Sequence, residues 1–326
     1  MVTEKATAIA CANIAFIKFW GKRDAELNLP ANSSLSMNLE GLTTVTTVEF
    51  SPDFDDDLVI LNGQEMRGET RQRIVAHLDR VRARAGRRAR ARVISENSFP
   101  VGTGLASSAS GFAALSLAAS KAAGLELSQR ELSILARFGS GSACRSIPGG
   151  FTEWAAGTCS DDSFARQIAP PEHWDLRDVI AIVSQAHKRV GSTEGHALAP
   201  TSHLYQARVA SVADRLPQAR AALLEKDFST LGPLIEEDAV SMHAVMMTSR
   251  PPIYYWLPGS IQLIHEVQNW RAEGLEVYFT FDAGPNIHLI CQAADQAKVE
   301  KRLEDIEEVL EVIVSGPGPG VQVIEP

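Results

Sequence analysis

FPVGTGLASSAS, residues 99–110, connects a predicted strand at residues 91–95 to a helix of small residues that we expect to end near Gly124. Glycines let the backbone approach an anion closely, and a helix N-terminus offers unpaired N–H groups and the positive end of its dipole. Ser107 and Ser108 add hydroxyls for a phosphate group or Mg²⁺. The segment lacks the Gly-Lys-Ser/Thr ending of a Walker A loop. On this segment alone, a phosphate site and close packing of a small-residue helix are equally compatible with the pattern.

Outward from this turn, strand and helix patterns are mixed without a regular βαβ alternation. Alternating or β-branched runs predict strands at residues 41–50, 91–95, 179–183, 277–281 and 287–291, and Asn62-Gly63 predicts a hairpin within residues 58–66. Apolar residues at helical spacing and capping residues predict helices at 70–84, 128–138 and 294–310, and a mostly helical stretch at 201–248. Such a mixture favours an α+β fold in two lobes, which we place at residues 1–185 and 186–326.

Charge and hydropathy exclude several classes of protein. The chain has 326 residues with 31 Lys+Arg against 40 Asp+Glu, and its net charge of −9 argues against a dedicated nucleic-acid binder. Residues 80–92 are rich in arginine although the whole chain is acidic. A solvated helix end leading into an exposed strand explains these arginines more simply than an anion-binding patch. No run approaches the ~18 apolar residues of a membrane span. Four cysteines without a Cys-x-x-Cys pair are typical of free thiols in a reducing cytoplasm.

A second segment suited to anions is GSGSACRS, residues 139–146. Ser140, Ser142 and Arg145 can gather around one anion, and the planar guanidinium fork matches a carboxylate or a phosphate. The alternative is a flexible surface loop with a solvated arginine. The basic loop 187–193 has the same two interpretations, a site for a second phosphorylated group or a solvated turn.

Two charged residues stand in or beside apolar runs. We expect Lys18 to lie within an apolar strand, where a lysine requires an anionic partner because an unpaired buried charge is costly. Asp282 follows the predicted strand at 277–281 and is able to pair with Lys18 and to act as a base. The simpler alternative for Asp282 is an Asx turn that caps a hairpin.

Six segments taken together resemble the mevalonate diphosphate decarboxylase family of the GHMP small-molecule kinase superfamily. They are ANIAFIKFWGKRD (12–24), LPANSSLSMNL (29–39), FPVGTGLASSAS (99–110), GSGSACRS (139–146), GGFTEW (149–154) and FTFDAGPN (279–286). The resemblance implies the GHMP kinase fold, with a deep cleft between a ribosomal-protein-like N-terminal lobe and a C-terminal α+β lobe. It also implies a reaction that uses ATP and Mg²⁺ to phosphorylate the C3 hydroxyl of 5-diphosphomevalonate. Loss of phosphate and CO₂ then gives isopentenyl diphosphate.

The same resemblance implies roles for individual residues. Asp282 orients or deprotonates the C3 hydroxyl, Lys18 tunes its charge, and Arg145 grips the substrate carboxylate. The implied substrate-binding residues are Asn13, Phe19, Lys22, Ser140, Ser142 and Ser192. The implied ATP-binding residues are Gly102, Gly104, Ser107 and Ser108, of which Ser108 also lies near the metal. Asn97, just before the glycine-rich turn, is our candidate for an adenine contact, and the family's usual assembly implies a homodimer.

Two positions depart from the family pattern and leave alternatives open. Position 19 is Phe where the family usually has Tyr, which removes one hydroxyl from the expected diphosphate site. Position 193 is Thr, where bacterial members have either Arg or Thr. Both departures leave open a shorter substrate, 5-phosphomevalonate, which would give isopentenyl phosphate. A more distant alternative is a GHMP kinase that stops at phosphoryl transfer.

Overall fold

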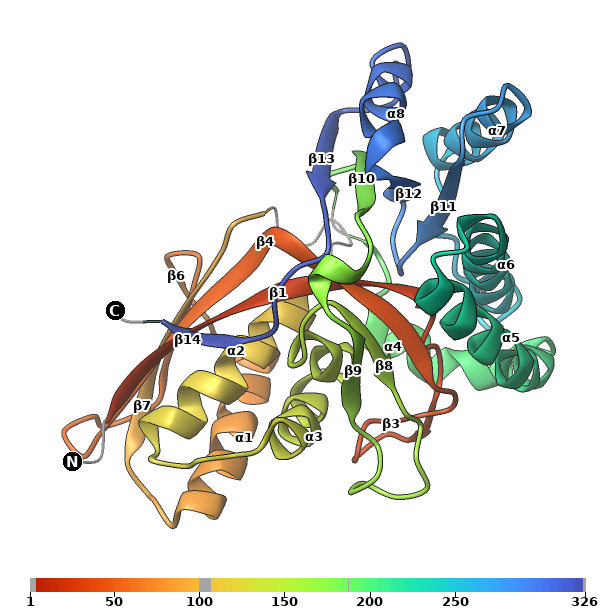
Figure 1. Ribbon diagram of the computed structural model, residues 1–326. Helices are drawn as coiled ribbons and strands as arrows, with labels where there is room; N and C mark the ends of the chain where they lie inside the picture. Colours follow the sequence, from red (N-terminus) through yellow and green to blue (C-terminus); the bar gives the residue numbers. More distant parts are fainter. Residues whose placement is uncertain (1–3, 100–106, 187, 325–326) are drawn as a thin grey trace.

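The computed structural model describes residues 4–99, 107–186 and 188–324, and it has the α+β architecture that the sequence predicts (Figure 1). The larger sheet has the order β14-β1-β4-β7-β5-β6, and β8 extends it beside β4 and pairs with β9. Its strands are β1 (Lys5–Ile17), β4 (Ser34–Ser51), β5 (Leu58–Leu61), β6 (Gln64–Glu65), β7 (Arg90–Asn97), β8 (Phe151–Trp154), β9 (Ala165–Ala169) and β14 (Gln322–Ile324). The helices α1 (Gly68–Ala85), α2 (Ser107–Ala122) and α3 (Gln129–Gly139) lie together on one face of this sheet (Figure 1).

The smaller sheet has the order β11-β12-β10-β13. Its strands are β10 (Leu176–Ile182), β11 (Val277–Phe281), β12 (Ile287–Gln292) and β13 (Glu311–Ser315). The helices α7 (Pro258–Ala272) and α8 (Gln296–Leu303) pack on one of its faces. A short hairpin of β2 (Lys22–Asp24) and β3 (Leu29–Pro30) and the short helices α4 (Ser192–Leu198) and η1 (Gly141–Ser146) complete the elements near the cleft.

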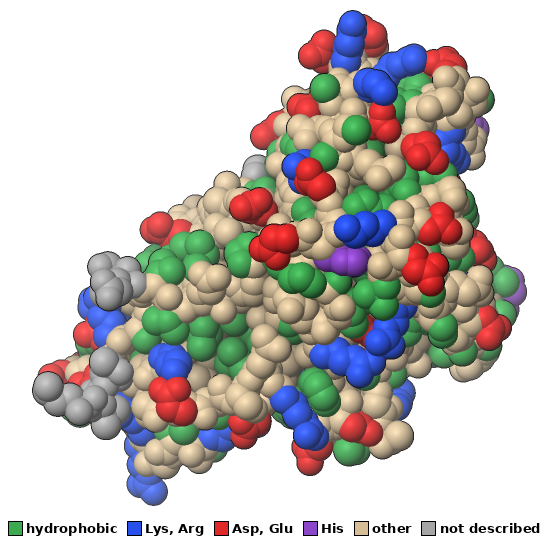
Figure 2. Space-filling model, viewed as in Figure 1, with side chains coloured by type: hydrophobic (Ala, Val, Ile, Leu, Met, Phe, Trp, Pro, Cys, Tyr) green, Lys and Arg blue, Asp and Glu red, His purple; other side chains and the backbone are tan. Residues whose placement is uncertain are grey.

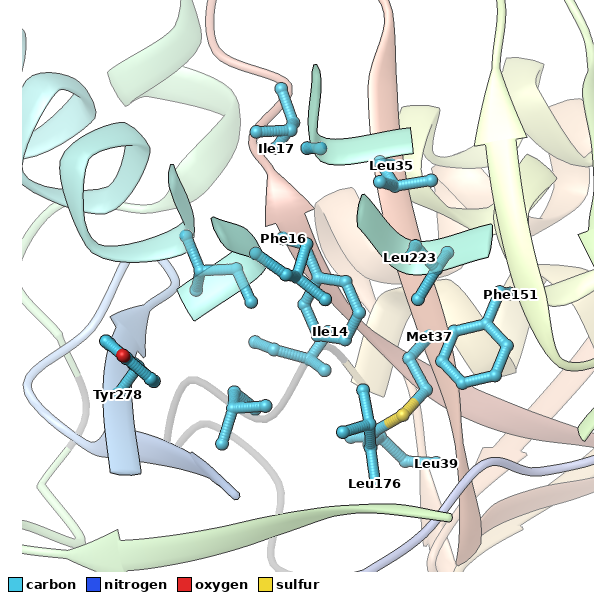
Figure 3. Close-up of a cluster of buried hydrophobic side chains, with 14 of the residues drawn as sticks. Ile14, Phe16, Ile17, Leu35, Met37, Leu39, Phe151, Leu176, Leu223 and Tyr278 are labelled. Carbon is cyan, nitrogen blue, oxygen red and sulfur yellow. The ribbon is translucent and has the colours of Figure 1, made fainter. Parts of the chain in front are cut away.

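One hydrophobic core joins the two sheets. Side chains from β1 and β4 of the larger sheet meet side chains from β10 and β11 of the smaller sheet, together with α5 (Tyr205–Glu225) and α6 (Phe228–Met247). Figure 3 shows Phe16 and Met37 of the larger sheet, Leu223 of α5, and Leu176 and Tyr278 of the smaller sheet in this core, with the sulfur end of Met37 beside Leu176. Because both sheets bury surface in the same core, the residues at their junction are held in fixed relative positions.

Side chains of the long β1–β4 hairpin pack in two separate hydrophobic cores, and the pairing register of the two strands shifts between them. Ala8 and Ala10 pack with α1 to α3, whereas Ile14 and Phe16 pack in the core shared with the smaller sheet. The register shift lies between Cys11 and Ala12 of β1, opposite the segment of β4 that contains Gly41 with a φ of 78°. An irregularity of this kind bends a strand pair and re-aims its side chains.

The structure corrects two predicted elements. The predicted helix at 294–310 is wrong in extent, because α8 ends at Leu303. Glu304, Asp305, Glu307 and Glu308 follow, and negative charge is unfavourable at the C-terminal end of a helix dipole. Lys18 does not lie within a strand, since β1 ends at Ile17 and Lys18 directly follows it.

The pairing of strands bears on how the chain is divided. β10, which ends at Ile182, lies in the smaller sheet, and β14 near the C-terminus returns to pair with β1. The division at 185/186 stays a prediction. Among the described residues, no helix combines the length and hydropathy needed to cross a bilayer. On the face seen in Figure 2, Lys and Arg side chains are interspersed with Asp and Glu.

A buried histidine between α1 and α2 gives the fold a measurable pH dependence. The hydroxyl of Ser116 donates to the Phe112 carbonyl at 2.6 Å, so His77 Nε2–H donates to Ser116 Oγ at 2.9 Å. Burial lowers the pKa of His77 to about 3 from 6.5. As the pH falls below 6.5, His77 takes up a proton in the unfolded chain but stays neutral in the folded one. The free energy of unfolding therefore decreases as the pH falls.

We expect His77 to lower the free energy of unfolding by about 2 kcal/mol between pH 7 and pH 5. The variant His77→Gln keeps an amide donor for Ser116 but does not titrate, so its unfolding free energy should fall by about 2 kcal/mol less over the same range. Urea denaturation at both pH values measures this difference. Equal pH dependence in the two proteins would contradict the assignment.

Candidate functional site

A cleft of about 450 Å³ opens where β1, α3, α4, α6 and the end of β11 approach one another. Its lining includes ten of the residues predicted from the sequence: Lys18, Phe19, Lys22, Ser107, Ser108, Ser140, Ser142, Arg145, Ser192 and Asp282. Five cationic side chains line it, from Lys18, Lys22, Arg73, Arg145 and Lys188. Among the described lining residues, Asp282 is the only carboxylate. The cleft therefore has the charge balance of a site for a polyanion.

The predicted pair of Lys18 and Asp282 is present. Lys18 Nζ donates to Asp282 Oδ1 at 2.9 Å, with Lys18 only 2% exposed and Asp282 25% exposed toward the cleft. Burial by itself would raise the pKa of Asp282, but the charges of Lys18, His288 and Arg145 together hold that pKa below its ordinary value. Asp282 is therefore ionised at neutral pH, and its free carboxylate edge faces the cavity.

The backbone of Lys18 is held by buried side chains from α5 and α6. Asp238 accepts a hydrogen bond from the Lys18 N–H at 2.6 Å, while Asn32 Nδ2 donates to the Lys18 carbonyl at 2.9 Å. Arg208 donates to the same carbonyl at 3.2 Å and to Asp238 at 3.0 Å, and Arg215 donates to Asp238 at 3.0 Å. Every polar group of the Lys18 backbone thus has a fixed partner, which leaves the side chain little freedom of position.

A second buried contact holds the backbone at Asp282. His243 on α6 lies 3.2 Å from the Asp282 carbonyl, and it stacks on Trp256 with ring centroids 4.6 Å apart. A carbonyl only accepts, so His243 Nε2 carries the proton. Burial lowers the pKa of His243 to about 3, so the imidazole stays neutral beside the Lys18 ammonium. Neither this histidine nor Asp238 carried a sequence signal, because both act through backbone groups of distant residues.

Arg145 is aimed into the cleft by two neighbours. Its Nε donates to Asn13 Oδ1 at 3.0 Å, and its Nη1 donates to Ser34 Oγ at 3.2 Å. Within the described residues Nη2 has no hydrogen-bond partner, so it is available to an anion. Asn13 itself is buried, does not line the cleft, and donates to Ser146 Oγ at 2.8 Å. The structure thus makes Asn13 a support for Arg145.

Three serine hydroxyls form a chain along one wall. Ser108 Oγ lies 3.2 Å from Ser140 Oγ, which lies 3.3 Å from Ser142 Oγ. They join the start of α2 to the segment that begins η1. Lys22 stands half-buried near them, and its pKa is lowered by burial and by the charge of Arg73. These donors and cations form one continuous anion-binding wall.

Several cleft residues had no assigned role in the sequence interpretation. Lys188 comes from the basic loop and donates to the Ala283 carbonyl at 2.9 Å, next to Asp282. Arg73 on α1 donates to the Gly139 carbonyl at 3.2 Å. His196 on α4 also lines the cleft. The loop 187–193 carried a signal in its charge, whereas Arg73 and His196 are brought in only by helix packing.

Two of the predicted ATP contacts cannot be placed, and one lies elsewhere. Gly102 and Gly104 fall outside the described residues. Asn97 does not line the cleft, and its side-chain oxygen accepts a hydrogen bond from Thr44 at 2.6 Å.

Family models match both halves of the chain. Residues 10–165 match the diphosphomevalonate decarboxylase-like N-terminal domain, and residues 178–315 match the mevalonate 5-diphosphate decarboxylase C-terminal domain. The diphosphomevalonate decarboxylase of Candida albicans is 42% identical over 90% of this chain and 86% of its own length. The phosphomevalonate decarboxylase of Haloferax volcanii is 37% identical over 98% of each chain.

Solved structures agree in fold. The mevalonate diphosphate decarboxylase of Staphylococcus aureus superposes with a TM-score of 0.95 at 38% identity, covering 99% of this chain and 98% of that one. A complex of MDDEF with MVAPP, AMPPCP and magnesium has a TM-score of 0.93 at 39% identity and covers 99% of both chains.

The network behind Lys18 predicts a large difference between two adjacent carboxylates on α6. Asp238→Asn removes the charge that two buried arginines share, and we expect it to lower the free energy of unfolding by about 3–5 kcal/mol. Glu237→Gln is the matched control, because Glu237 pairs with the same Arg215 but is 63% exposed, and it should change stability by about 1 kcal/mol or less. Urea denaturation of the two variants measures both values. Similar decreases in the free energy of unfolding of both variants would contradict the stabilising role of Asp238.

Proposed function

Because the chain belongs to the diphosphomevalonate decarboxylase family, we propose that its cleft binds 5-diphosphomevalonate and ATP and produces isopentenyl diphosphate, ADP, phosphate and CO₂. The single observation that carries this proposal is the meeting of the Lys18–Asp282 pair, Arg145 and the serine wall in one cleft. The substrate carries a C3 hydroxyl and a carboxylate near one end and a phosphate chain at the other. The Lys18–Asp282 pair suits the hydroxyl, Arg145 suits the carboxylate, and the serine hydroxyls suit the phosphate chain. The chain is accordingly an ATP-dependent decarboxylase.

Asp282 acts on the C3 hydroxyl in this proposal. A tertiary hydroxyl is a poor leaving group, so it first takes the γ-phosphoryl group of ATP and gives up its proton. Asp282 stays charged because its pKa is depressed, which makes it a weak base that orients the hydroxyl and accepts the proton as the bond to phosphorus forms. Lys18 keeps the carboxylate edge in place and limits its basicity.

Arg145 acts on the substrate carboxylate. When the C3–O bond to the new phosphate breaks, positive character develops at C3, and the C–C bond to the carboxylate supplies the electron pair that forms the double bond. CO₂ leaves without a covalent link to the protein. Arg145, fixed by Asn13 and Ser34, holds the carboxylate in the orientation that this elimination needs. The cationic lining stabilises the departing phosphate.

The residues around the start of α2 fit ATP and Mg²⁺. Ser107 and Ser108 are the first residues of this helix and line the cleft. Gly102 and Gly104 stay predicted ATP contacts. No cluster of three His, Cys, Asp or Glu side chains suited to a metal occurs within residues 4–99, 107–186 and 188–324. Mg²⁺ usually keeps several waters and takes its remaining ligands from phosphates and one or two protein oxygens, so the Ser108 hydroxyl is a fitting donor. When bound, the metal neutralises charge on the transferring phosphate.

A second candidate substrate is 5-phosphomevalonate. The end-to-end match to the Haloferax volcanii phosphomevalonate decarboxylase favours it, as does Phe19 in place of the family's usual Tyr. Lys22, Ser140 and Ser142 nevertheless supply a full charge and two hydroxyls for an outer phosphate. We therefore propose the diphosphate as the preferred substrate. The homodimer, the cytoplasmic location, the absence of nucleic-acid binding and the adenine contact of Asn97 stay predictions.

Release of CO₂ from each phosphorylated mevalonate in the presence of ATP and Mg²⁺ tests the proposal. Release of CO₂ from the diphosphate with the higher kcat/KM is the expected result. A preference for the monophosphate of more than tenfold would overturn the choice of substrate and leave the reaction class intact. Phosphoryl transfer without CO₂ would identify a kinase.

Asp282→Asn should lower kcat by at least ~100-fold while substrate still binds, because the amide neither accepts the proton nor carries the orienting charge. Calorimetric titration with substrate and measurement of CO₂ release separate these two effects. Asp295→Asn, at an ion pair with Lys298 beyond the C-terminal end of β12, is the matched control and should retain full activity because Asp295 does not line the cleft. A kcat within a few-fold of the wild type for Asp282→Asn would remove Asp282 from the mechanism.

Phe19→Tyr should raise the kcat/KM ratio of diphosphate to monophosphate by about tenfold, the value of one hydrogen bond to a charged group. The ring of Phe19 borders Gly141, which lies between Ser140 and Ser142. A tyrosine hydroxyl at position 19 would therefore face the anion-binding wall. Phe138→Tyr, at another phenylalanine of the same cleft, is the control. An unchanged ratio in Phe19→Tyr would show that position 19 does not read the phosphate chain.

A further inference from the structure

His196 lines the cleft beside Phe19, which stands where the family usually has a tyrosine. Its ring stacks on Phe19 with centroids 4.2 Å apart and an angle of 28°. The Trp20 ring also packs against the imidazole, with centroids 4.4 Å apart and an angle of 34°. α4 approaches this closely because residue 195 is glycine, where a Cβ would come within 2.6 Å of the Trp20 ring. Contacts with two aromatic rings therefore fix the imidazole in position and orientation.

One hydrogen bond fixes which ring nitrogen carries the proton. The backbone N–H of Gly21 donates to His196 Nδ1 at 3.0 Å. Because Nδ1 accepts, the neutral ring must carry its proton on Nε2. Gly21 is locked in turn: its φ is 89°, and a Cβ there would lie 2.3 Å from the hydroxyl of Tyr205. The donor thus comes from a backbone position that is itself fixed.

The opposite nitrogen is free to meet a ligand. Among the described residues Nε2 forms no hydrogen bond, and it is not among their buried polar atoms that lack a partner, so it remains open to the cleft. Burial, together with the charges of Lys22, Arg145, Lys188 and Arg208, lowers the pKa of His196 well below its ordinary value. Protonation would also place an Nδ1–H against the Gly21 N–H. The ring therefore presents an uncharged Nε2–H donor among cations.

We propose that His196 donates its Nε2–H to the phosphate chain of the phosphorylated mevalonate, as the neutral donor that Phe19 cannot provide. This role rests on the proposed function. It makes His196 a substrate-specificity residue that a search of the sequence for charged motifs does not find. The competing explanation is purely structural, in which His196 only ties α4 to the turn at Gly21.

Two amide substitutions separate the contact with the phosphate chain from the contact with the Gly21 N–H. In His196→Asn, the side-chain oxygen occupies the place of Nδ1, so it keeps the acceptor for Gly21 and loses the group that faces the cleft. In His196→Gln, the amide nitrogen reaches the place of Nε2, so it keeps the donor and loses the acceptor for Gly21. The measurements are kcat and KM for both phosphorylated mevalonates and for ATP, with the melting temperature of each variant.

The expected result is a rise of about tenfold in KM for the phosphorylated mevalonate in His196→Asn, with a smaller change in kcat and in KM for ATP. His196→Gln should recover most of that loss despite a lower melting temperature. A rise confined to the diphosphate places the contact on the outer phosphate, and a rise for both substrates places it on the inner one. Wild-type KM in His196→Asn, or equal losses in both variants, would overturn the proposal.

Calorimetric titration with the same two mevalonate phosphates distinguishes this proposal from the proposed function. Binding by the wild type without CO₂ release contradicts the function alone. Binding that His196→Asn leaves unchanged contradicts the role of His196 alone, whether or not CO₂ is released.

Discussion

Lys18 carries a buried ammonium group at the junction of the two sheets, and the cleft is built around the neutralisation of that charge. An unpaired charge at such a position is too costly to keep, so its partners must be present in the folded state. Asp282 at the end of β11 supplies the counter-charge, and Asp238 on α6 accepts the backbone N–H. These residues are more than two hundred positions from Lys18 in the chain, so the charge can be satisfied only when both lobes are in place.

The same arrangement gives the cleft its chemical character. In the part of the cleft that the structure describes, one carboxylate stands among five cations, and the charge of Lys18 lowers the pKa of that carboxylate. Such a group is suited to orienting a hydroxyl during phosphoryl transfer, where bond-making to phosphorus is late and little proton abstraction is needed. Lys22, Arg73, Arg145 and Lys188 form no ion pair with a carboxylate of the described residues, so their charges favour a ligand with several negative charges. Arg145 is aimed by neutral partners, Asn13 and Ser34, so its charge is left for the ligand.

Neutral groups complete the site beside these charges. His243 and His196 are both held as uncharged imidazoles, and in each case a backbone contact indicates the tautomer. His243 supports the backbone of Asp282, while His196 faces the cavity. Burial among cations keeps both rings neutral, which prevents further positive charge from accumulating in a site that already holds five cations.

Local patterns in the chain predict the class of fold and most of the charged residues of the cleft. Local patterns were sufficient for the strand at residues 277–281, for the helix at 128–138 with its Ser128–Glu131 capping box, and for the two serines and arginine of residues 139–146. The apolar context of Lys18 requires an anionic partner, but only the folded chain shows that Asp282 is that partner. These features depend on interactions between neighbouring residues or on the chemistry of one residue type, which a sequence displays directly.

Which distant groups meet depends on how the whole chain packs. Asp238, His243, Arg73 and His196 lie on helices whose patterns indicate packing alone, and their roles depend on which backbone atom or cavity wall each faces. Asn13 does not line the cleft and acts on it through Arg145, whose Nε donates to the Asn13 side-chain oxygen, while its part in substrate binding stays a prediction. The end of α8 at Leu303 is an exception, because the acidic residues that follow it are visible in the sequence even though the apolar spacing predicts a longer helix. Side-chain direction and long-range contact follow from packing of the whole chain, and no local pattern of residues specifies them.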